Sequence, residues 1–305
     1  MYRVAAKDGS GLSGKTTCTD AAPGPGPDRE ADFLVVGDMA SCNDDGAAAV
    51  GRFLDQSTTP IIGVGDYAYP DGTPEQFADC FDPKLGRHKS RFSPVAGNHE
   101  YNTPGAAPYF SYFGAVAGDP DKGYYAQTRG DWLILYLNSN CGEVGGCNPA
   151  SQQYRWAAQQ VVNAPADSCL AVVTHHPRWS SWGNYADARF LDDVTTMLHD
   201  AGLDLLLTGH AHMYERLARV DPDRNRDPVS GFRQFTVGTG GAALRVSNPA
   251  DVLDISESLH ADRFGVLGLE LSDDSYRWRF VDVDGNTVVD VDGNTVDQGS
   301  DTCNN

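Results

Sequence analysis

The sequence predicts an α/β fold in one domain. Short apolar runs recur along the chain, and most of them are followed by a turn and then by a stretch with apolar residues at helical spacing. Strands that alternate with helices in this way indicate an α/β core. The length of 305 residues is enough to bury a sizeable core. The 33 glycines and 17 prolines indicate many turns and argue against a helical bundle.

The predicted elements follow one another in a regular order. Six apolar runs are predicted to be strands, at residues 33–36, 61–64, 132–137, 170–173, 203–207 and 235–237. A further short strand is expected at residues 94–96. Three segments with helical spacing, each with a Ser, Asp or Asn near its start as a possible cap, are predicted to be helices, at residues 44–56, 151–162 and 187–199. Near the end of the chain, residues 264–271 and 276–283 are predicted to pair as strands.

Two segments depart from this pattern. Residues 1–30 are polar and rich in Gly and Pro, as in a leader or linker. Within them, residues 9–16 match the P-loop expression, but neither a buried strand before it nor a helix after it is predicted, so a flexible segment is favoured over a nucleotide site. The octapeptide Val-Asp-Val-Asp-Gly-Asn-Thr-Val of residues 281–288 recurs unchanged at 289–296. Its Asp-Gly turns predict a duplicated hairpin rather than a calcium loop, because the EF-hand ligand order is missing.

Charge and hydropathy exclude several classes of function. With 23 basic and 42 acidic side chains, the formal net charge is −19. Most of such a surface repels phosphate, so a role in holding nucleic acid or an anionic lipid surface is disfavoured. No apolar run approaches the roughly 20 residues that a membrane span needs.

The seven cysteines favour disulfides over a metal site. They are scattered, and none of them forms a C-x-x-C pair. The first expected bond joins Cys141 to Cys147, which are separated by only five residues, and the others expected are 42–80 and 169–303, which leaves one cysteine over. Free buried thiols are the alternative. Disulfides would place the protein in a secreted, extracellular or periplasmic setting, as a mature form from which any signal peptide has been removed.

Five short motifs stand at the carboxyl ends of predicted strands, where open α/β sheets place their ligands. The motifs are Gly37-Asp38, Gly65-Asp66-Tyr67-Ala68-Tyr69, Gly97-Asn98-His99-Glu100, His175-His176-Pro177 and Gly209-His210-Ala211-His212. Singly, each is compatible with a turn or a hydrogen-bonded loop residue. Together they offer oxygen and imidazole ligands for two metal ions. One shared carboxylate can hold two ions about 3.5–4 Å apart, and Asp66 is the natural bridge.

This ordered set of motifs resembles the calcineurin-like metallophosphoesterase superfamily, and within it the purple acid phosphatases, over about residues 32–300. The first motif continues as Asp38-Met39-Ala40, without the His that many superfamily members carry there. Tyr69 stands where purple acid phosphatases have a tyrosine, and the two features together select that branch. The resemblance implies a four-layer α/β/β/α sandwich over residues 31–305, with the C-terminal hairpin as an extension.

The resemblance also implies the ligands of both metals. The first metal, expected to be ferric iron, would be bound by Asp38, Asp66, Tyr69 and His212. The second, a divalent iron, zinc or manganese ion, would be bound by Asp66, Asn98, His175 and His210. His176 receives no ligand role. The sequence departs from the purple acid phosphatases at Ala40, where Gly is usual, and in residues 179–185, which contain no substrate-contacting histidine; no substrate-binding residue is therefore predicted.

The predicted function is a secreted binuclear metallohydrolase that cleaves a small phosphate monoester with a hydroxide activated by the two metals. His99 is expected to neutralise charge on the phosphoryl oxygens, or else to support a metal ligand, and Glu100 is expected to orient His99. A phosphodiesterase, including a phospholipase-D-like enzyme of the same fold, remains an alternative. A non-catalytic, metal-stabilised surface-binding protein is a further alternative.

Overall fold

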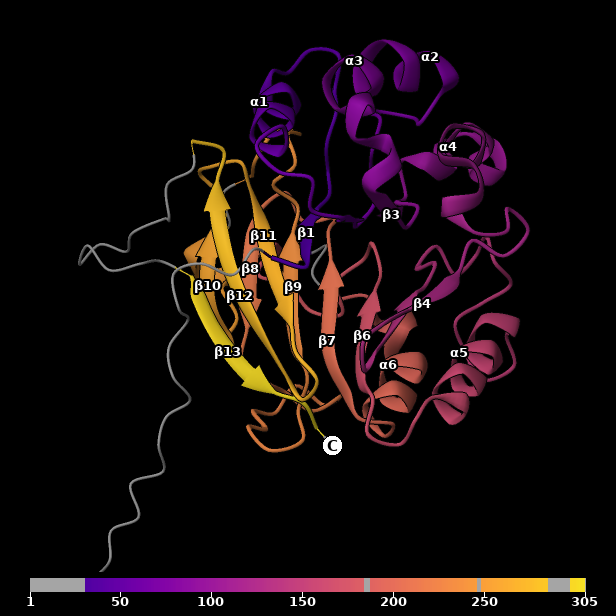
Figure 1. The fold of residues 1–305 in the computed structure, drawn as a ribbon, viewed down its shortest axis with the longest axis vertical. Helices are drawn as coiled ribbons and strands as arrows, with labels where there is room; N and C mark the ends of the chain where they lie inside the picture. Colours follow the sequence, from indigo (N-terminus) through magenta and orange to yellow (C-terminus); the bar gives the residue numbers. More distant parts are fainter. Residues whose placement is uncertain (1–30, 184–186, 246–247, 285–296, 305) are drawn as a thin grey trace, which may run out of the picture.

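The computed structural model describes residues 31–183, 187–245, 248–284 and 297–304 (Figure 1). Within these residues the strands form two sheets. A six-stranded sheet has the order β13-β12-β11-β1-β2-β3, and a seven-stranded sheet has the order β10-β8-β9-β7-β6-β5-β4. Both sheets mix parallel and antiparallel pairs. The predicted α/β class is therefore confirmed, as a sandwich of two mixed sheets.

The first sheet combines the start and the end of the described chain. β1 runs parallel to β2, and β2 runs parallel to β3, whereas β11 pairs antiparallel with β1 on its other side. β12 and β13 then extend the sheet as antiparallel strands. The bounds are β1 (Phe33–Val36), β2 (Ile61–Gly63), β3 (Phe92–Pro94), β11 (Gly265–Leu271), β12 (Ser275–Asp282) and β13 (Gln298–Thr302).

The second sheet is built from the middle of the chain. Its central strands β5, β6, β7 and β9 are parallel neighbours, and β4, β8 and β10 are antiparallel additions at its two sides. The bounds are β4 (Tyr125–Arg129), β5 (Trp132–Tyr136), β6 (Cys169–Val173), β7 (Leu203–Thr208), β8 (Tyr214–Leu217), β9 (Arg233–Val237) and β10 (Ser256–His260).

Helices cover the outer face of each sheet. In Figure 1, α1 to α4 lie together at one end of the view, and α5 and α6 lie beside the second sheet. The bounds of the α-helices are α1 (Gly46–Leu54), α2 (Pro74–Gln76), α3 (Asp82–Leu85), α4 (Ala107–Phe113), α5 (Gln152–Asn163) and α6 (Asp192–His199). Shorter turns of helix, mostly 3-10, are η1 (Phe77–Phe81), η2 (Gly86–Arg91), η3 (Glu100–Asn102), η4 (Pro104–Ala106), η5 (Gly114–Ala117), η7 (Arg189–Leu191) and η8 (Pro249–Asp251).

Three large apolar cores hold these layers together. The first lies between the sheets, where Val35 and Leu267 of one sheet meet Leu205 and Phe235 of the other. The second packs α1, η1, α3 and α4 against the first sheet, and the third packs α5 and α6 against the second. Apolar burial is the main favourable term in folding, and three cores between four layers account for the arrangement that the resemblance implied.

Most predicted elements occupy the expected residues, with two shifts. The strand expected at 94–96 is β3, which ends at Pro94. The helix expected from residue 187 begins at Asp192, because residues 189–191 form a tighter 3-10 turn and Leu191 stands at its N-cap without a side-chain hydrogen bond. By contrast, Ser151 caps α5 as expected, and its Oγ accepts the Tyr154 N–H at 3.3 Å.

The three expected disulfides are formed. Cys42 bonds to Cys80, Cys141 to Cys147 and Cys169 to Cys303. The last bond joins β6 of the second sheet to the residue after β13 of the first. Cys169, Cys303 and Asp204 lie close enough together to hold a metal, but the two sulfurs are already bonded to each other. Disulfides of this number fit an oxidising compartment.

Some predictions fall outside the described residues. These are the polar leader of residues 1–30, with its P-loop-like stretch, and residues 285–296 of the duplicated octapeptide. β12 ends within the first copy at Asp282, and β13 begins directly after Asp297, so the two strands that flank the repeats pair at the edge of the first sheet. Among the described helices, none combines the length and apolarity that crossing a membrane requires.

Candidate metal centre

The loops that follow five strands bring the predicted ligands together. Asp38 follows β1, Asp66 follows β2, and Asn98 lies in the loop after β3; His175 follows β6, and His210 follows β7. The backbones of Asp38, Asp66 and His210 adopt positive φ angles of 59°, 53° and 68°. Such left-handed conformations are uncommon for residues other than Gly and cluster at functional sites.

Two glycines allow these loops to approach one another closely. A Cβ atom on Gly97 would lie 2.1 Å from Asp66 Oδ1, and a Cβ atom on Gly65 would lie 2.4 Å from His175 Nδ1. Gly65 also has a φ of 93°, which a side chain would make unfavourable. The Gly that precedes Asp66 and the Gly that precedes Asn98 are therefore required by the packing of the site.

The first cluster of side chains surrounds the hydroxyl of Tyr69. This oxygen lies 3.0 Å from Asp38 Oδ1, 3.1 Å from Asp66 Oδ2 and 3.0 Å from His212 Nε2. His212 Nε2 is also 3.5 Å from Asp38 Oδ1. The four residues expected to bind the first metal thus converge on one point.

The second cluster surrounds the side-chain oxygen of Asn98. Asn98 Oδ1 lies 2.9 Å from His175 Nε2 and 2.9 Å from His210 Nδ1. His175 Nε2 is in turn 3.3 Å from Asp66 Oδ2. Asp66 therefore takes part in both clusters, in the position that a bridging carboxylate would occupy.

The donor set fits metal ions. His175 Nδ1 lies 2.8 Å from the carbonyl oxygen of Val64, and His212 Nδ1 lies 2.8 Å from that of Ala243. A carbonyl only accepts hydrogen bonds, so both Nδ1 atoms donate, and each Nε2 is free to bind a metal through its lone pair. The carboxylates of Asp38 and Asp66 are buried, and no Lys or Arg among the described residues pairs with either. Cations would supply the missing positive charge.

The titration properties of the cluster are strongly perturbed. Burial raises the pKa of Asp38 and, together with the Asp38 carboxylate, raises the pKa of Tyr69 well above its ordinary value. Burial by itself would lower the pKa of His175, but the Asp66 carboxylate raises it to about 9. Burial and the neighbouring His175 lower the pKa of His210 to about 3. Opposite shifts packed into one cluster are characteristic of functional sites.

His99 lies beside Asp66 rather than within either cluster. Its backbone N–H donates to Asp66 Oδ1 at 2.9 Å, and its Nε2 is 3.8 Å from Asp66 Oδ2. Its Nδ1 is 2.5 Å from the carbonyl oxygen of Pro70, which orients the ring. The side chain is 29% exposed and lines the hollow beside the first cluster. It is therefore placed to meet a molecule that enters the hollow.

The expectation that Glu100 orients His99 is wrong. The buried carboxylate of Glu100 accepts the backbone N–H groups of Asp66 at 3.0 Å, Tyr67 at 2.8 Å and Gly97 at 2.8 Å. It thus fixes the loops that carry Asp66 and Asn98. With the N–H of Ala68 at 3.4 Å, four amide donors satisfy this carboxylate, which is what a buried acid requires.

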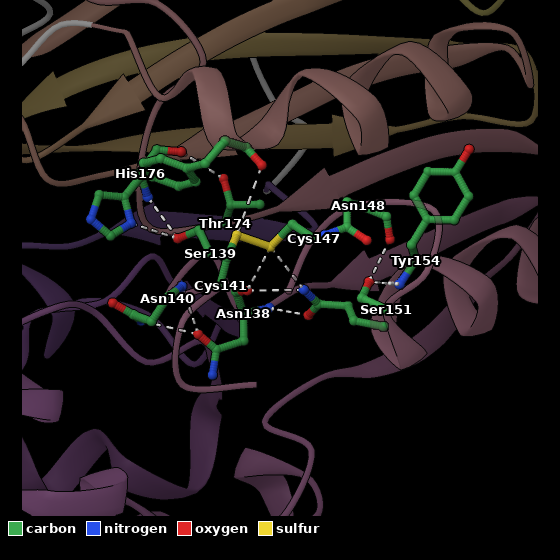
Figure 2. The surroundings of a disulfide bond; sticks show 12 residues. Asn138, Ser139, Asn140, Cys141, Cys147, Asn148, Ser151, Tyr154, Thr174 and His176 are labelled. Atoms are coloured by element: carbon green, nitrogen blue, oxygen red, sulfur yellow. Dashed lines mark hydrogen bonds between the residues drawn. A yellow bond between two sulfur atoms is a disulfide. The ribbon is translucent and has the colours of Figure 1, made fainter. Parts of the chain in front are cut away.

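A second hollow borders the other cluster. It has a volume of about 510 Å³, and its lining includes Asn98, Tyr101, Asn102, Glu143, His176 and Phe190. Figure 2 shows Ser139 and His176 beside the Cys141–Cys147 disulfide, whose loop contributes to the wall. His176 Nδ1 lies 2.8 Å from Ser139 Oγ. His176 is grouped with His175 and His210 within metal-binding range, yet its Ser139 contact turns one ring nitrogen away from them.

Sequence reasoning did not predict that Trp182 and Arg245 would line the first hollow. Trp182 and Arg245 line it together with Asp66, His99 and His212, and the hollow has a volume of about 250 Å³. The lack of histidines in residues 179–185 marked this loop as different, but it did not indicate what Trp182 does. Arg245 lies outside every motif, and no sequence signal pointed to it.

Comparisons with known proteins show which family and which fold the chain resembles. The sequence model of the family described as "Calcineurin-like phosphoesterase" matches residues 31–214. "Purple acid phosphatase 1" of Ipomoea batatas is 26% identical over 221 residues, which cover 65% of this chain and 45% of that protein. "Probable inactive purple acid phosphatase 1" of Arabidopsis thaliana is 20% identical over 267 residues, which cover 73% of this chain and 43% of that protein. The chain spans less than half the length of both relatives.

The fold is shared with a solved structure. The structure of the purple acid phosphatase PPD1 from yellow lupin (Lupinus luteus) seeds matches 88% of this chain and 53% of its own chain, with a TM-score of 0.74 and 18% identity. At this level of identity the match establishes the sandwich architecture.

Proposed function

Since the chain belongs to the calcineurin-like phosphoesterase family, we propose that it is a purple acid phosphatase-like phosphohydrolase that cleaves phosphate monoesters with two bound metal ions. The observation that carries the proposal is the convergence of seven side chains into two clusters that share Asp66. Asp38, Asp66, Tyr69 and His212 would hold the first metal, and Asp66, Asn98, His175 and His210 would hold the second. The disulfides support secretion.

Such a pair of ions, when bound, supplies an activated water and neutralises charge on the phosphoryl group. The protein's own residues would prepare the site for this chemistry. The amide of His99 holds the Asp66 carboxylate, and the ring of His99 faces the hollow, where it would donate to a phosphoryl oxygen. The carbonyl groups of Val64 and Ala243 fix the tautomers of His175 and His212.

The direct test combines metal analysis with hydrolysis of para-nitrophenyl phosphate. We expect about two metal ions per chain and loss of hydrolysis on removal of the metals by chelation, with recovery on their return. A protein that binds two ions and hydrolyses no phosphate ester would contradict the proposal and favour a non-catalytic, surface-binding role. A curated relative named as inactive makes this outcome worth testing directly.

The identity of the first metal depends on Tyr69. A phenolate bound to ferric iron absorbs visible light, so we expect the isolated protein to be coloured and Tyr69→Phe to bleach it. Tyr67→Phe is the matched control, because the buried Tyr67 hydroxyl makes no hydrogen bond within the described structure. A colourless, iron-free and fully active protein would instead favour zinc or manganese at both positions.

A phosphodiesterase is the second candidate. The hollow of about 510 Å³ beside Asn98 offers room for a second ester group. Parallel assays with para-nitrophenyl phosphate and bis-para-nitrophenyl phosphate separate the two candidates. A marked preference for the diester would replace the monoesterase assignment.

A further inference from the structure

Two stacked side chains lie at the rim of the hollow beside the first cluster, and neither has a role in the proposed chemistry. Trp182 and Arg245 line the same hollow as Asp66, His99 and His212. The guanidinium carbon of Arg245 lies 5.4 Å from the centroid of the Trp182 ring. This is the range of a cation–π contact, which holds an arginine side chain in one orientation.

Trp182 is positioned directly against the proposed metal ligands. Its ring lies 5.8 Å from the ring of His212, with an interplanar angle of 17°, and meets the ring of His210 edge-on at 5.9 Å. The main chain adds a second link, since the Arg245 N–H donates to the His212 carbonyl oxygen at 3.2 Å. Arg245 is thus attached to the metal centre through both its side chain and its backbone.

A buried carboxylate holds the loop that carries Trp182. Glu215 of β8 accepts the backbone N–H of Ser181 at 3.0 Å and also the hydroxyl of Ser181. Ser181 Oγ in turn accepts the N–H of Leu253 at 3.0 Å. Gln234 of β9 fixes the preceding residues, because its Oε1 accepts the Trp179 N–H at 3.2 Å. The platform under Arg245 therefore rests on two strands of the second sheet.

The charge of Arg245 is available to a ligand. Its side chain is exposed at the rim, and no carboxylate among the described residues lies within 4.0 Å of its guanidinium nitrogens. Two acids line this hollow: Asp66 would bind the cations, and the carboxylate of Asp44 lies more than 4.0 Å from the guanidinium nitrogens of Arg245. A guanidinium matches the oxygens of a phosphoryl group through paired N–H donors.

We propose that Arg245, held over Trp182, binds the phosphoryl oxygens of the substrate and makes the site selective for monoesters. This inference rests on the proposed function, whose substrate class it specifies. A monoester near neutral pH carries almost one more negative charge than a diester, so a fixed guanidinium attracts it more strongly. Trp182 is the positioning residue in this arrangement, and Arg245 is the binding residue.

The first experiment measures the binding of inorganic phosphate to the metal-loaded protein by calorimetry, independently of turnover. We expect Arg245→Gln to weaken phosphate about tenfold or more, and Arg245→Lys to weaken it less. Arg52→Gln on α1 is the matched control, because Arg52 is an exposed arginine that lines neither hollow, and it should bind phosphate as the wild type does. Metal content and circular dichroism confirm that each variant is folded and loaded. A phosphate affinity of Arg245→Gln within twofold of the wild type would overturn the inference.

The second experiment compares the two ester substrates. Arg245→Gln should lower kcat/KM for para-nitrophenyl phosphate about tenfold and that for bis-para-nitrophenyl phosphate about threefold or less. Equal losses on both esters would refute the role in selectivity. If the wild type hydrolyses neither ester but still binds phosphate in an Arg245-dependent manner, the proposed function fails and the anion site stands.

A double-mutant cycle tests whether Trp182 positions Arg245. Trp182→Leu removes the aromatic face, so it should weaken phosphate binding, and Arg245→Gln added to it should then have little further effect. Trp182→Phe retains a face and should rescue most of the affinity. Fully additive losses would show that the stacked pair does not act as a unit.

Discussion

Asp66 is the residue that both clusters of the candidate metal centre share. One of its oxygens, Oδ2, lies within 3.3 Å of both Tyr69 Oη and His175 Nε2, and the other accepts the His99 N–H at 2.9 Å. We expect Asp66→Asn to lower metal content and hydrolysis together, with hydrolysis reduced at least about 100-fold, because an amide bridges two cations poorly. Metal analysis alongside the ester assay checks this. Asp79→Asn is the control, because Asp79 is an exposed acid outside both hollows. Normal metal content in Asp66→Asn would exclude the bridging role.

Asp204 provides a pH-dependent prediction away from the metal centre. Burial raises its pKa to about 6, although it accepts the N–H groups of Leu170 and Asn304. The folded state thus binds this proton more tightly than the unfolded state does. The stabilisation is complete below the unfolded pKa of 3.8 and is lost as the pH rises through about 6.

The comparison of wild type with Asp204→Asn isolates this effect. The side chain at position 204 of the variant cannot ionise, so the variant does not lose stability when Asp204 of the wild type does. Between about pH 4 and pH 7, the free energy of unfolding of the variant should therefore rise relative to that of the wild type, on the order of 3 kcal/mol. Chemical denaturation at several pH values measures the difference. Asp200→Asn, whose side chain is 74% exposed, serves as the control. Parallel pH profiles for the wild type and Asp204→Asn would contradict the assignment.

Among the elements, the loops after β2 and β3 are linked by a single side chain at the start of η3. Glu100 accepts amide N–H groups from both loops. Glu100→Gln keeps the shape but turns an NH₂ group toward backbone donors, so we expect the free energy of unfolding to fall by about 2 kcal/mol and metal affinity to fall with it. Thermal unfolding and metal titration test this. Glu75→Gln in α2 is the control, because its position is exposed, and it should change neither the stability nor the metal affinity. Unchanged metal affinity in Glu100→Gln would show that the loops hold their positions without the Glu100 carboxylate.

The success of sequence reasoning varied with the kind of element. The central strands β1, β5 and β6 are continuous apolar runs, and β7 is apolar apart from Asp204 and Thr208. The residues of these strands were predicted because strands buried on both faces consist almost entirely of apolar residues. The strands β4, β10 and β13 lie at sheet edges and carry polar residues such as Gln127, Glu257 and Asp301, so hydropathy did not separate them from loops.

The candidate ligands were predictable for a related reason. Each stands directly after a strand in a short motif, so order along the chain is enough to expect that Asp38, Asp66 and Asn98 meet at one edge of the sheet. Arg245 reaches the hollow through tertiary packing against Trp182, and Glu100 contacts backbone groups that no motif describes. Contacts of this kind depend on the fold as a whole.

At the scale of the whole molecule, the two sheets are joined at the C-terminal strand. Cys169 of β6 bonds to Cys303 beyond β13. Asp301 of β13 forms an ion pair with Arg233 of β9, with 2.6 Å between Asp301 Oδ2 and Arg233 Nε. Asp297, just before β13, forms a second ion pair with Arg216 of β8, with 2.9 Å between Asp297 Oδ1 and Arg216 Nη2. The first sheet's outermost strand is thereby attached to the second sheet by both a covalent bond and ion pairs.

The lengths of the closed loops predict unequal effects of removing disulfides. The bond between Cys169 and Cys303 spans 134 residues, whereas that between Cys141 and Cys147 spans 6. Loop-closure entropy predicts a loss of about 5 kcal/mol for Cys169→Ala/Cys303→Ala and about 2 kcal/mol for Cys141→Ala/Cys147→Ala. Denaturant unfolding of both double variants measures the two losses. Equal losses would show that residual contacts, and not chain entropy, set the stability.

The Cys169–Cys303 bond also determines how the molecule would respond to pulling. The chain at position 304 is tethered by this bond to an interior strand of the opposite layer. Tension applied from that side would therefore reach β6 through the covalent link before it could peel β13 away residue by residue. After reduction of the bond, the same force could separate β13 from β12 one residue at a time. The redox state of this bond therefore determines whether the strands separate one after another or the two sheets resist the force together.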